Sequence, residues 1–262
     1  MLKYVHNAAS RPIADSKSDL HFVNHELILS WLSRFNLSTD FFVKPPTVYL
    51  EDAIVMPEEI NNELAQKTLE VVNAHLGSII DLLNSVTSYL GERDANIQSD
   101  LLFVLGAPSM ARIETAVKLY IDGVAPYLFI TGGKPLFKPE ADSEAIKYRE
   151  FALANGVPED KILVHDGAIN LADNVKGGLN RLDELGFNFN SMTTVTSWFN
   201  QRRSYAMLMK YVPDNVQVFR VNAPTSPTGG LNEYDWYRNE KGIKIVAGEF
   251  FKIRVQKIKV RI

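Results

Sequence analysis

Four short polar clusters within residues 101–205 hold the side chains that could bind or transform a small molecule. Each cluster follows a short apolar run and stands at the start of a helical pattern. In an open parallel α/β sheet such positions lie along the carboxyl edge of the strands, where crevices open and ligands bind. We therefore expect one composite site, made of Gly106, Ala107, Ser109, Arg112, Thr131, Gly132, Gly133, Asn170, Asp173, Asn174, Thr196, Ser197, Asn200 and Arg203, together with Glu144.

Two arginines in this set suggest an anionic ligand. Arg203 lies in the first turns of a helix whose expected cap is Ser197, where the helix dipole disfavours a cation by roughly 0.3–1 kcal/mol. A bound anion reverses that balance, because the helix amides and the guanidinium then converge on it. Arg112 repeats the pattern at an earlier helix. The alternative is that these arginines, and the neighbouring Arg202, are solvated or pair with carboxylates.

The glycines and carboxylates have two interpretations each. Gly132 and Gly133 could turn backbone amides toward a phosphate or carboxylate, although such a pair is also typical of a plain turn. Glu144 and Asp173 are the catalytic candidates, and each could grip a ribose hydroxyl, an amino group or a metal. Their alternative roles are helix-dipole stabilisation for Glu144 and a capping box for Asn170 with Asp173.

Composition narrows the class of protein. The 262 residues are 46% hydrophobic and 23% charged, enough for one large core or a core with a smaller appended layer. A net charge of −3 argues against a general nucleic-acid binder. The absence of cysteine excludes disulfides and thiolate chemistry, and the five histidines show no zinc-like spacing.

The beginning of the sequence lacks the apolar core of a signal peptide, and no run approaches the roughly 18 apolar residues of a membrane span. We therefore expect a cytoplasmic protein with no stable membrane association.

Two patterns of periodicity divide the chain. Residues 1–95 are predicted to be a helical extension, with helices over 20–36 and 57–91. Residues 96–262 are predicted to form a doubly wound, mostly parallel Rossmann-like α/β sheet with a C-terminal helix near 235–255. The expected strands are 101–105, 127–131, 161–165, 192–196 and 216–221, and the expected helices 109–122, 142–155, 171–185 and 199–211. Residues 222–233 are predicted to be a loop.

Familiar fingerprints are missing. No Gly-x-Gly-x-x-Gly follows the first strand and no acidic residue ends the second, which disfavours an ordinary dinucleotide dehydrogenase or methyltransferase. The phosphate loop of nucleotide-triphosphate motors and the Gly-x-Ser-x-Gly elbow of α/β-hydrolases are also absent from the sequence.

The ordered motifs nevertheless resemble those of the YdcF/SanA/ElyC family over about residues 100–210. The matching segments run from Leu101–Gly106 through Thr131–Gly133 and Asn170–Asn174 to Val195–Arg203, and Ala247-Gly248-Glu249 resembles the soluble YdcF branch. This resemblance implies a Rossmann-like fold and S-adenosylmethionine binding, without an established reaction.

Two positions depart from the family's pattern. Asp173 stands where the family has Glu, and Asn200 stands where anchored members carry His. An amide has no useful pKa, so Asn200 could orient a ligand or water but could not carry a proton.

Three hypotheses follow for the function. The protein binds a nucleotide-like ligand such as S-adenosylmethionine, with or without catalysis. Alternatively, it hydrolyses a phosphoester or pyrophosphate, with the arginines stabilising charge and Glu144 or Asp173 handling a proton or a divalent metal. The third possibility is a non-catalytic interaction module. The sequence leaves the oligomeric state open.

Overall fold

The structure is a computed structural model that describes residues 25–40, 56–134, 142–225 and 231–260. These residues form two compact units. Unit 1 is residues 92–224, and unit 2 comprises the described residues before 92 and after 224.

Unit 1 is built on a five-stranded sheet in the order β3-β2-β1-β4-β5, with every neighbouring pair parallel. Its strands are β1 (Leu101–Leu105), β2 (Leu128–Thr131), β3 (Ile162–His165), β4 (Ser191–Ser197) and β5 (Gln217–Ala223). The predicted doubly wound, Rossmann-like fold is thereby confirmed. The strand order reverses between β1 and β4, and ligands of such sheets bind at this switch point.

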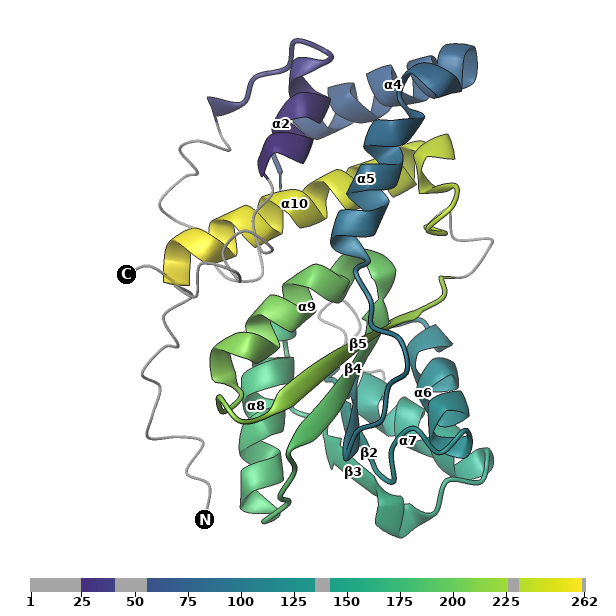
Figure 1. The fold of residues 1–262 in the computed structure, drawn as a ribbon, viewed down its shortest axis with the longest axis vertical. Helices are drawn as coiled ribbons and strands as arrows, with labels where there is room; N and C mark the ends of the chain where they lie inside the picture. The colour runs from purple at the N-terminus through teal and green to yellow at the C-terminus, as the bar shows by residue number, and fades with distance from the viewer. Residues whose placement is uncertain (1–24, 41–55, 135–141, 226–230, 261–262) are drawn as a thin grey trace. The chain divides into compact units, whose positions relative to one another are not determined.

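Helices cover both faces of the sheet (Figure 1). The helices α6 (Ala111–Ile121) and α7 (Glu144–Ala154) share one apolar cluster with the sheet, and α8 (Leu171–Glu184) and α9 (Trp198–Tyr211) share the other. The chain changes face after β3, as right-handed crossovers in a two-sided sheet require. This crossing separates the loops that follow β1 and β4, which opens the switch point between them.

The sheet at the centre of unit 1 packs closely against its neighbouring helices. All of β1 is buried, as expected for a continuous apolar strand inside a parallel sheet. On the α8 face, the rings of Phe103 and Phe129 lie 5.0 Å apart. A Cβ atom at Gly178 of α8 would come within 2.9 Å of both rings, so glycine permits the close approach of this helix to the sheet.

Glycine residues end two helices of unit 1. Gly123 and Gly156 have φ values of +75° and +88° just after α6 and α7, a left-handed conformation that glycine adopts without strain. The short 3-10 helix η3 (Glu159–Lys161) then leads into β3. The N-terminal end of α7 is capped by Ser143, whose hydroxyl accepts a hydrogen bond from Ile146 N at 3.1 Å.

The regular elements in the described part of unit 2 are helices. They are α2 (His25–Ser33), α4 (Glu58–His75), α5 (Ile80–Leu90) and α10 (Glu240–Val260), with 3-10 turns η2 (Leu76–Ser78) and η5 (Trp236–Arg238). Its core contains an edge-to-face pair, Trp31 and Trp236, whose ring centroids are 5.6 Å apart. Each indole donates to a threonine hydroxyl: Trp31 to Thr68 at 2.9 Å and Trp236 to Thr87 at 2.8 Å.

The prediction of one continuous helix over 57–91 is wrong, because the structure has two helices there. The helical segment starts as expected, at Glu58 after Pro57, but it breaks at η2 into α4 and α5. Gly77 in the break is a poor helix former, and the Ser78 hydroxyl satisfies the carbonyl of His75 at 2.9 Å. The predicted helix over 20–36 and loop over 222–233 lie partly outside the described residues.

The C-terminal helix was predicted to belong to the same domain as the sheet, but α10 lies in unit 2. Helix α10 packs against α4, and the Asn61 side chain of α4 donates to Lys244 O of α10 at 3.3 Å. Both helices belong to unit 2. Among the described helices, none combines the length and the apolar character that a membrane span requires.

Candidate functional site

Backbone hydrogen bonds draw the loops after β1, β2 and β3 together at the carboxyl edge of the sheet. Gly106 N donates to Thr131 O, and Gly132 N donates to His165 O at 3.0 Å. Glu144 N donates to Gly133 O at 2.9 Å, which fixes the start of α7 beside the end of β2. The first two predicted clusters and Glu144 therefore lie next to one another at the carboxyl edge of the sheet.

The glycines of these loops are required by loop-to-loop packing. A Cβ atom at Gly106 would lie 2.8 Å from both Glu144 Oε2 and Gly132 Cα. One at Gly133 would lie 1.6 Å from Ala168 O. This packing accounts for the glycine residues without a phosphate, and the phosphate-facing role predicted for Gly132 and Gly133 stays a prediction.

Arg112 joins the ends of β1 and β4 across the switch point. Its side chain is 6% exposed. One terminal nitrogen donates to Leu105 O at 3.0 Å and Gly106 O at 2.8 Å, and Nε donates to Ser197 Oγ at 3.2 Å. The first cluster is thus bonded to the fourth. The guanidinium also supplies positive charge close to Glu144.

Glu144 has a carboxyl group whose pKa is shifted by its surroundings. Burial raises its pKa above the ordinary value of 4.5, and the nearby charges of Arg112 and Lys147 only partly oppose that shift. Since Ser143 provides the helix cap, the Glu144 side chain is left to lie against Gly106 at the end of β1. A carboxyl with a raised pKa in a crevice is a candidate proton carrier.

Tyr148 was missed by the sequence analysis. It lies one turn after Glu144 and is 1% exposed, and its hydroxyl donates to Ala107 O at 3.1 Å and also to Ser109 O. Burial raises the pKa of Tyr148 to about 12. Tyr148 therefore acts as a neutral hydrogen-bond donor that holds the loop of Ala107 and Ser109. In the sequence, the one signal for this role is that Tyr148 lies one helical turn after Glu144.

The third cluster caps α8 and contacts β2. Asn170 Oδ1 accepts from Asp173 N at 2.9 Å, so the capping alternative is realised by Asn170. The Asn174 amide donates to Asn170 O, and its oxygen accepts from the Thr131 hydroxyl, each at 2.9 Å. These bonds connect the second and third clusters. Ligand contact by Asp173 and Asn174 stays a prediction.

Helix α9 begins at the fourth cluster. Ser197 holds the N-cap position, but its side chain makes no capping bond to any amide of the described first turn of α9, because its hydroxyl accepts from Arg112. The expected cap is in this respect wrong. Asn200 Oδ1 accepts from a terminal nitrogen of Arg203 at 3.3 Å, and both residues are partly buried, so these two predicted site residues share a face of α9.

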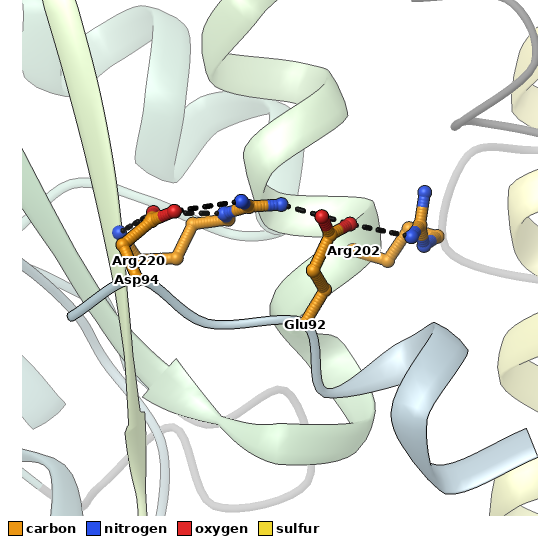
Figure 2. A network of polar contacts seen from close by, with 4 residues as sticks. All are labelled: Glu92, Asp94, Arg202 and Arg220. Atoms are coloured by element: carbon orange, nitrogen blue, oxygen red, sulfur yellow. Dashed lines mark hydrogen bonds and ion pairs between the residues drawn. The ribbon is translucent and has the colours of Figure 1, made fainter. Parts of the chain in front are cut away.

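Arg202 belongs to an ion-pair network that the sequence did not reveal (Figure 2). Its guanidinium lies 2.6 Å from Glu92 Oε2, which also lies 2.9 Å from Arg220. Arg220 in turn lies 2.8 Å from Asp94 Oδ1. The alternative that Arg202 pairs with a carboxylate is confirmed. No local spacing signals these partners, which are separated by more than a hundred residues.

The same network covers an edge of the sheet. Asp94 N donates to Arg220 O at 3.1 Å, and Asp94 Oδ2 accepts from Arg220 N at 2.9 Å. Residues near 94 thereby occupy hydrogen-bonding groups of the edge strand β5. Covering an exposed strand edge protects a sheet from pairing with other chains.

His165 ends β3, and its carbonyl oxygen accepts the bond from Gly132 in the candidate site. Burial lowers the pKa of His165 below 6.5, and a Cβ atom at Gly177 would lie 2.6 Å from its Nε2, so the ring packs against α8. Within the described ranges, no three His, Cys, Asp or Glu side chains gather closely enough to hold a metal ion. A divalent metal remains part of the hydrolase alternative only.

Comparison with known proteins adds one relative. The chain is 35% identical over 112 residues, 42% of its length, to an uncharacterized protein of Streptomyces coelicolor (SCO4629). It spans about half, 51%, of that relative's length. No family model matches the chain.

Proposed function

We propose that unit 1 binds a small, nucleotide-like molecule at the carboxyl edge of its sheet, in the cytoplasm, with S-adenosylmethionine as the first candidate. The observation that carries this proposal is the bonding of the predicted clusters to one another around the β1/β4 switch point, which Arg112 spans from Gly106 O to Ser197 Oγ. Membership of the YdcF/SanA/ElyC family is part of the same proposal and is supported by the order of the motifs.

The parts of the ligand are assigned by charge. An anionic group would lie at the start of α9, where the first amides of the helix, Asn200 and Arg203 offer donors. Glu144 would accept a hydrogen bond from a ribose hydroxyl or an amino group, since it lies at the opposite side of the switch point beside Gly106. Arg112 would position both sides, because its donors are used to join them.

A phosphoester or pyrophosphate hydrolase is the second candidate function. The observation that favours it is the raised pKa of Glu144 close to the Arg112 guanidinium. In such a reaction Glu144 would accept the proton of the attacking water, while arginines and helix amides would stabilise the charge that develops on the phosphoryl oxygens. Any divalent metal would have to be bound partly by the substrate, as magnesium commonly is.

A binding screen distinguishes these candidates. The melting temperature of the full chain is measured with S-adenosylmethionine, S-adenosylhomocysteine, adenine nucleotides, sugar nucleotides and pyrophosphate, each with and without magnesium. A ligand at ~100-fold its dissociation constant contributes about 2.7 kcal/mol, which gives a visible shift. A shift with adenosyl compounds supports the first proposal. Phosphate release that requires magnesium supports the second, and no response to any compound contradicts both and favours an interaction module.

A further inference from the structure

Strand β4 has an unusual composition for its place in the sheet. It lies between β1 and β5, where parallel strands are ordinarily rich in Val, Ile and Leu, yet it reads Ser-Met-Thr-Thr-Val-Thr-Ser. Thr193 is explained, because its hydroxyl pairs with Ser99 Oγ at 2.7 Å. Thr194 and Thr196 are 0% exposed, and their hydroxyls have no hydrogen-bond partner anywhere in the described chain.

Helix α9 presents matching polar groups to the same interface. Gln201 is 0% exposed and Ser204 is 1% exposed, and their spacing puts them on the face of Leu208, which packs in the core. Both polar atoms of Gln201 and the hydroxyl of Ser204 are likewise without a partner among the residues that the structure describes. Thr194 and Thr196 face α9, since they alternate with Val195, which packs on the opposite side.

The α9 polar cluster, defined as Thr194, Thr196, Gln201 and Ser204, therefore holds five unpaired buried polar atoms. Unpaired groups of this kind destabilise a fold, and apolar residues of similar size would fill the space without that cost. A binding role accounts for such groups, because a ligand supplies the partners that the protein lacks.

The cluster lies directly behind the proposed anion subsite. Side chains on a helix lean toward its N-terminus, so Gln201 leans toward the start of α9, next to Asn200. Thr196 is the penultimate residue of β4, immediately before Ser197. The positive end of α9 and a set of uncharged donors and acceptors thus adjoin each other at the switch point.

We infer that the α9 polar cluster is the subsite for an uncharged part of the ligand whose anionic part binds at the start of α9; this inference rests on the proposed function. Gln201 offers an acceptor beside a donor, and each hydroxyl can give or accept a hydrogen bond. The group that fits is one with a donor and an acceptor side by side, as on the amino edge of adenine, which glutamine pairs with bidentately. Because the five atoms are sealed from solvent, binding requires the first turn of α9 to move.

The test uses Gln201→Leu, which removes both unpaired atoms while keeping the approximate shape of the side chain. We expect this variant alone to melt about 2–4 °C higher than the parent, since the unpaired polar atoms are gone. Thr196→Val is the second variant, should Gln201→Leu fail to fold. Gln217→Leu is the matched control, because Gln217 is exposed on β5.

Binding is then measured by calorimetry with adenosine monophosphate and with purine riboside monophosphate, which lacks the amino group. The parent should prefer adenosine monophosphate by about tenfold or more, and Gln201→Leu but not Gln217→Leu should remove the preference. Equal binding of the two probes by the parent, or an unchanged preference in Gln201→Leu, would overturn the subsite and leave the proposed function standing. If the parent binds neither these probes nor any compound of the screen, both fall together.

Discussion

Glu144 and Arg112 are the pair on which the proposed chemistry of the site depends. Both side chains lie near the end of β1, where Arg112 donates hydrogen bonds to two carbonyl groups and a hydroxyl. The Glu144 carboxylate is therefore only partly compensated by that charge, and burial still raises its pKa. The ionised form of Glu144 therefore destabilises the folded protein, and a hydrogen bond donated by a ligand would reduce this cost.

The pH dependence of Glu144→Gln follows from this shift. The folded protein holds the Glu144 proton more firmly than the unfolded chain, so ionisation of Glu144 lowers the stability of the parent as the pH rises above 4.5. Gln cannot ionise. The free energy of unfolding of the variant minus that of the parent should therefore increase between about pH 4 and about pH 8. Urea denaturation across this range checks it, and a difference that falls with pH would show that the carboxylate is stabilised instead.

Arg203→Ala should separate binding from stability. The side-chain bond from Arg203 to Asn200 is long, 3.3 Å, so we expect its loss to lower the unfolding free energy by no more than about 1 kcal/mol. The shift in melting temperature that an anionic ligand produces should vanish. Arg181→Ala is the control, because Arg181 forms an exposed pair with Glu184 on α8. A large stability loss in Arg203→Ala without ligand would mean that the arginine is structural.

Gly133→Ala tests the packing of the loops. The added Cβ atom would overlap the carbonyl oxygen of Ala168, which is backbone and cannot rotate away. We expect a loss of about 1–3 kcal/mol, measured by urea denaturation, as for other overpacked sites. Gly167→Ala is the control, because its Cβ atom would meet only the His165 ring at an ordinary 3.6 Å. Equal losses in the two variants would contradict the assigned packing.

Much of the site was predictable because its residues stand at strand ends. Gly106 and Gly132 directly follow their strands and Ser197 ends its strand, and parallel strands bring such positions to one edge. Long-range partners were not predictable. Nothing local in the sequence connects Glu92 with Arg202, and Gln201 resembles an ordinary surface residue of a helix until its burial is known.

Helix α9 is the element that combines these findings. Its first turns carry Asn200 and Arg203, and its buried face carries Gln201. Arg202 connects the helix to the segment at Glu92 through an ion pair. The described part of unit 1 begins at that segment. Arg202 is 7% exposed on its side chain, so the pair is less screened by solvent than a surface pair.

Glu92→Gln should therefore weaken unit 1 measurably. The variant removes the carboxylate shared by Arg202 and Arg220, and Glu92 is itself 36% exposed, so we expect a loss of about 1–3 kcal/mol rather than the full cost of a buried charge. Glu184→Gln removes an exposed partner of Arg181 and should change the unfolding free energy by less than about 0.5 kcal/mol. Similar values for the two variants in chemical denaturation would show that the network contributes little.

Element boundaries in unit 1 agree with the prediction to within a few residues, since apolar runs alternate with helices and glycine marks two of the helix ends. The prediction failed at η2, because periodicity continues across Leu76–Ser78 although the backbone does not. The grouping of α10 with α4 also escaped prediction. An amphipathic helix reveals that it has a partner but does not reveal which one.

Within the described residues, each unit has buried apolar side chains of its own. Phe103 of β1 is one of them in unit 1, and Leu83 of α5, which is 0% exposed, is one in unit 2. Phe103→Ala should cost about 3–5 kcal/mol and Leu83→Ala about 2–5 kcal/mol. If the units unfold separately, scanning calorimetry should show each variant lowering a different transition. Both variants lowering one shared transition equally would show that the chain unfolds as a single cooperative body.

The location of binding is tested most directly by an amide NMR titration of the full chain with S-adenosylmethionine. We expect shifted resonances at Gly106, Gly132, Ser197 and the first turn of α9, which surround the β1/β4 switch point, and little change in α2 or α5. Shifts confined to unit 2, for example at the groove lined by Leu27 and Tyr89, would contradict a ligand site at the carboxyl edge. The absence of any shift at saturating ligand would contradict S-adenosylmethionine as the ligand.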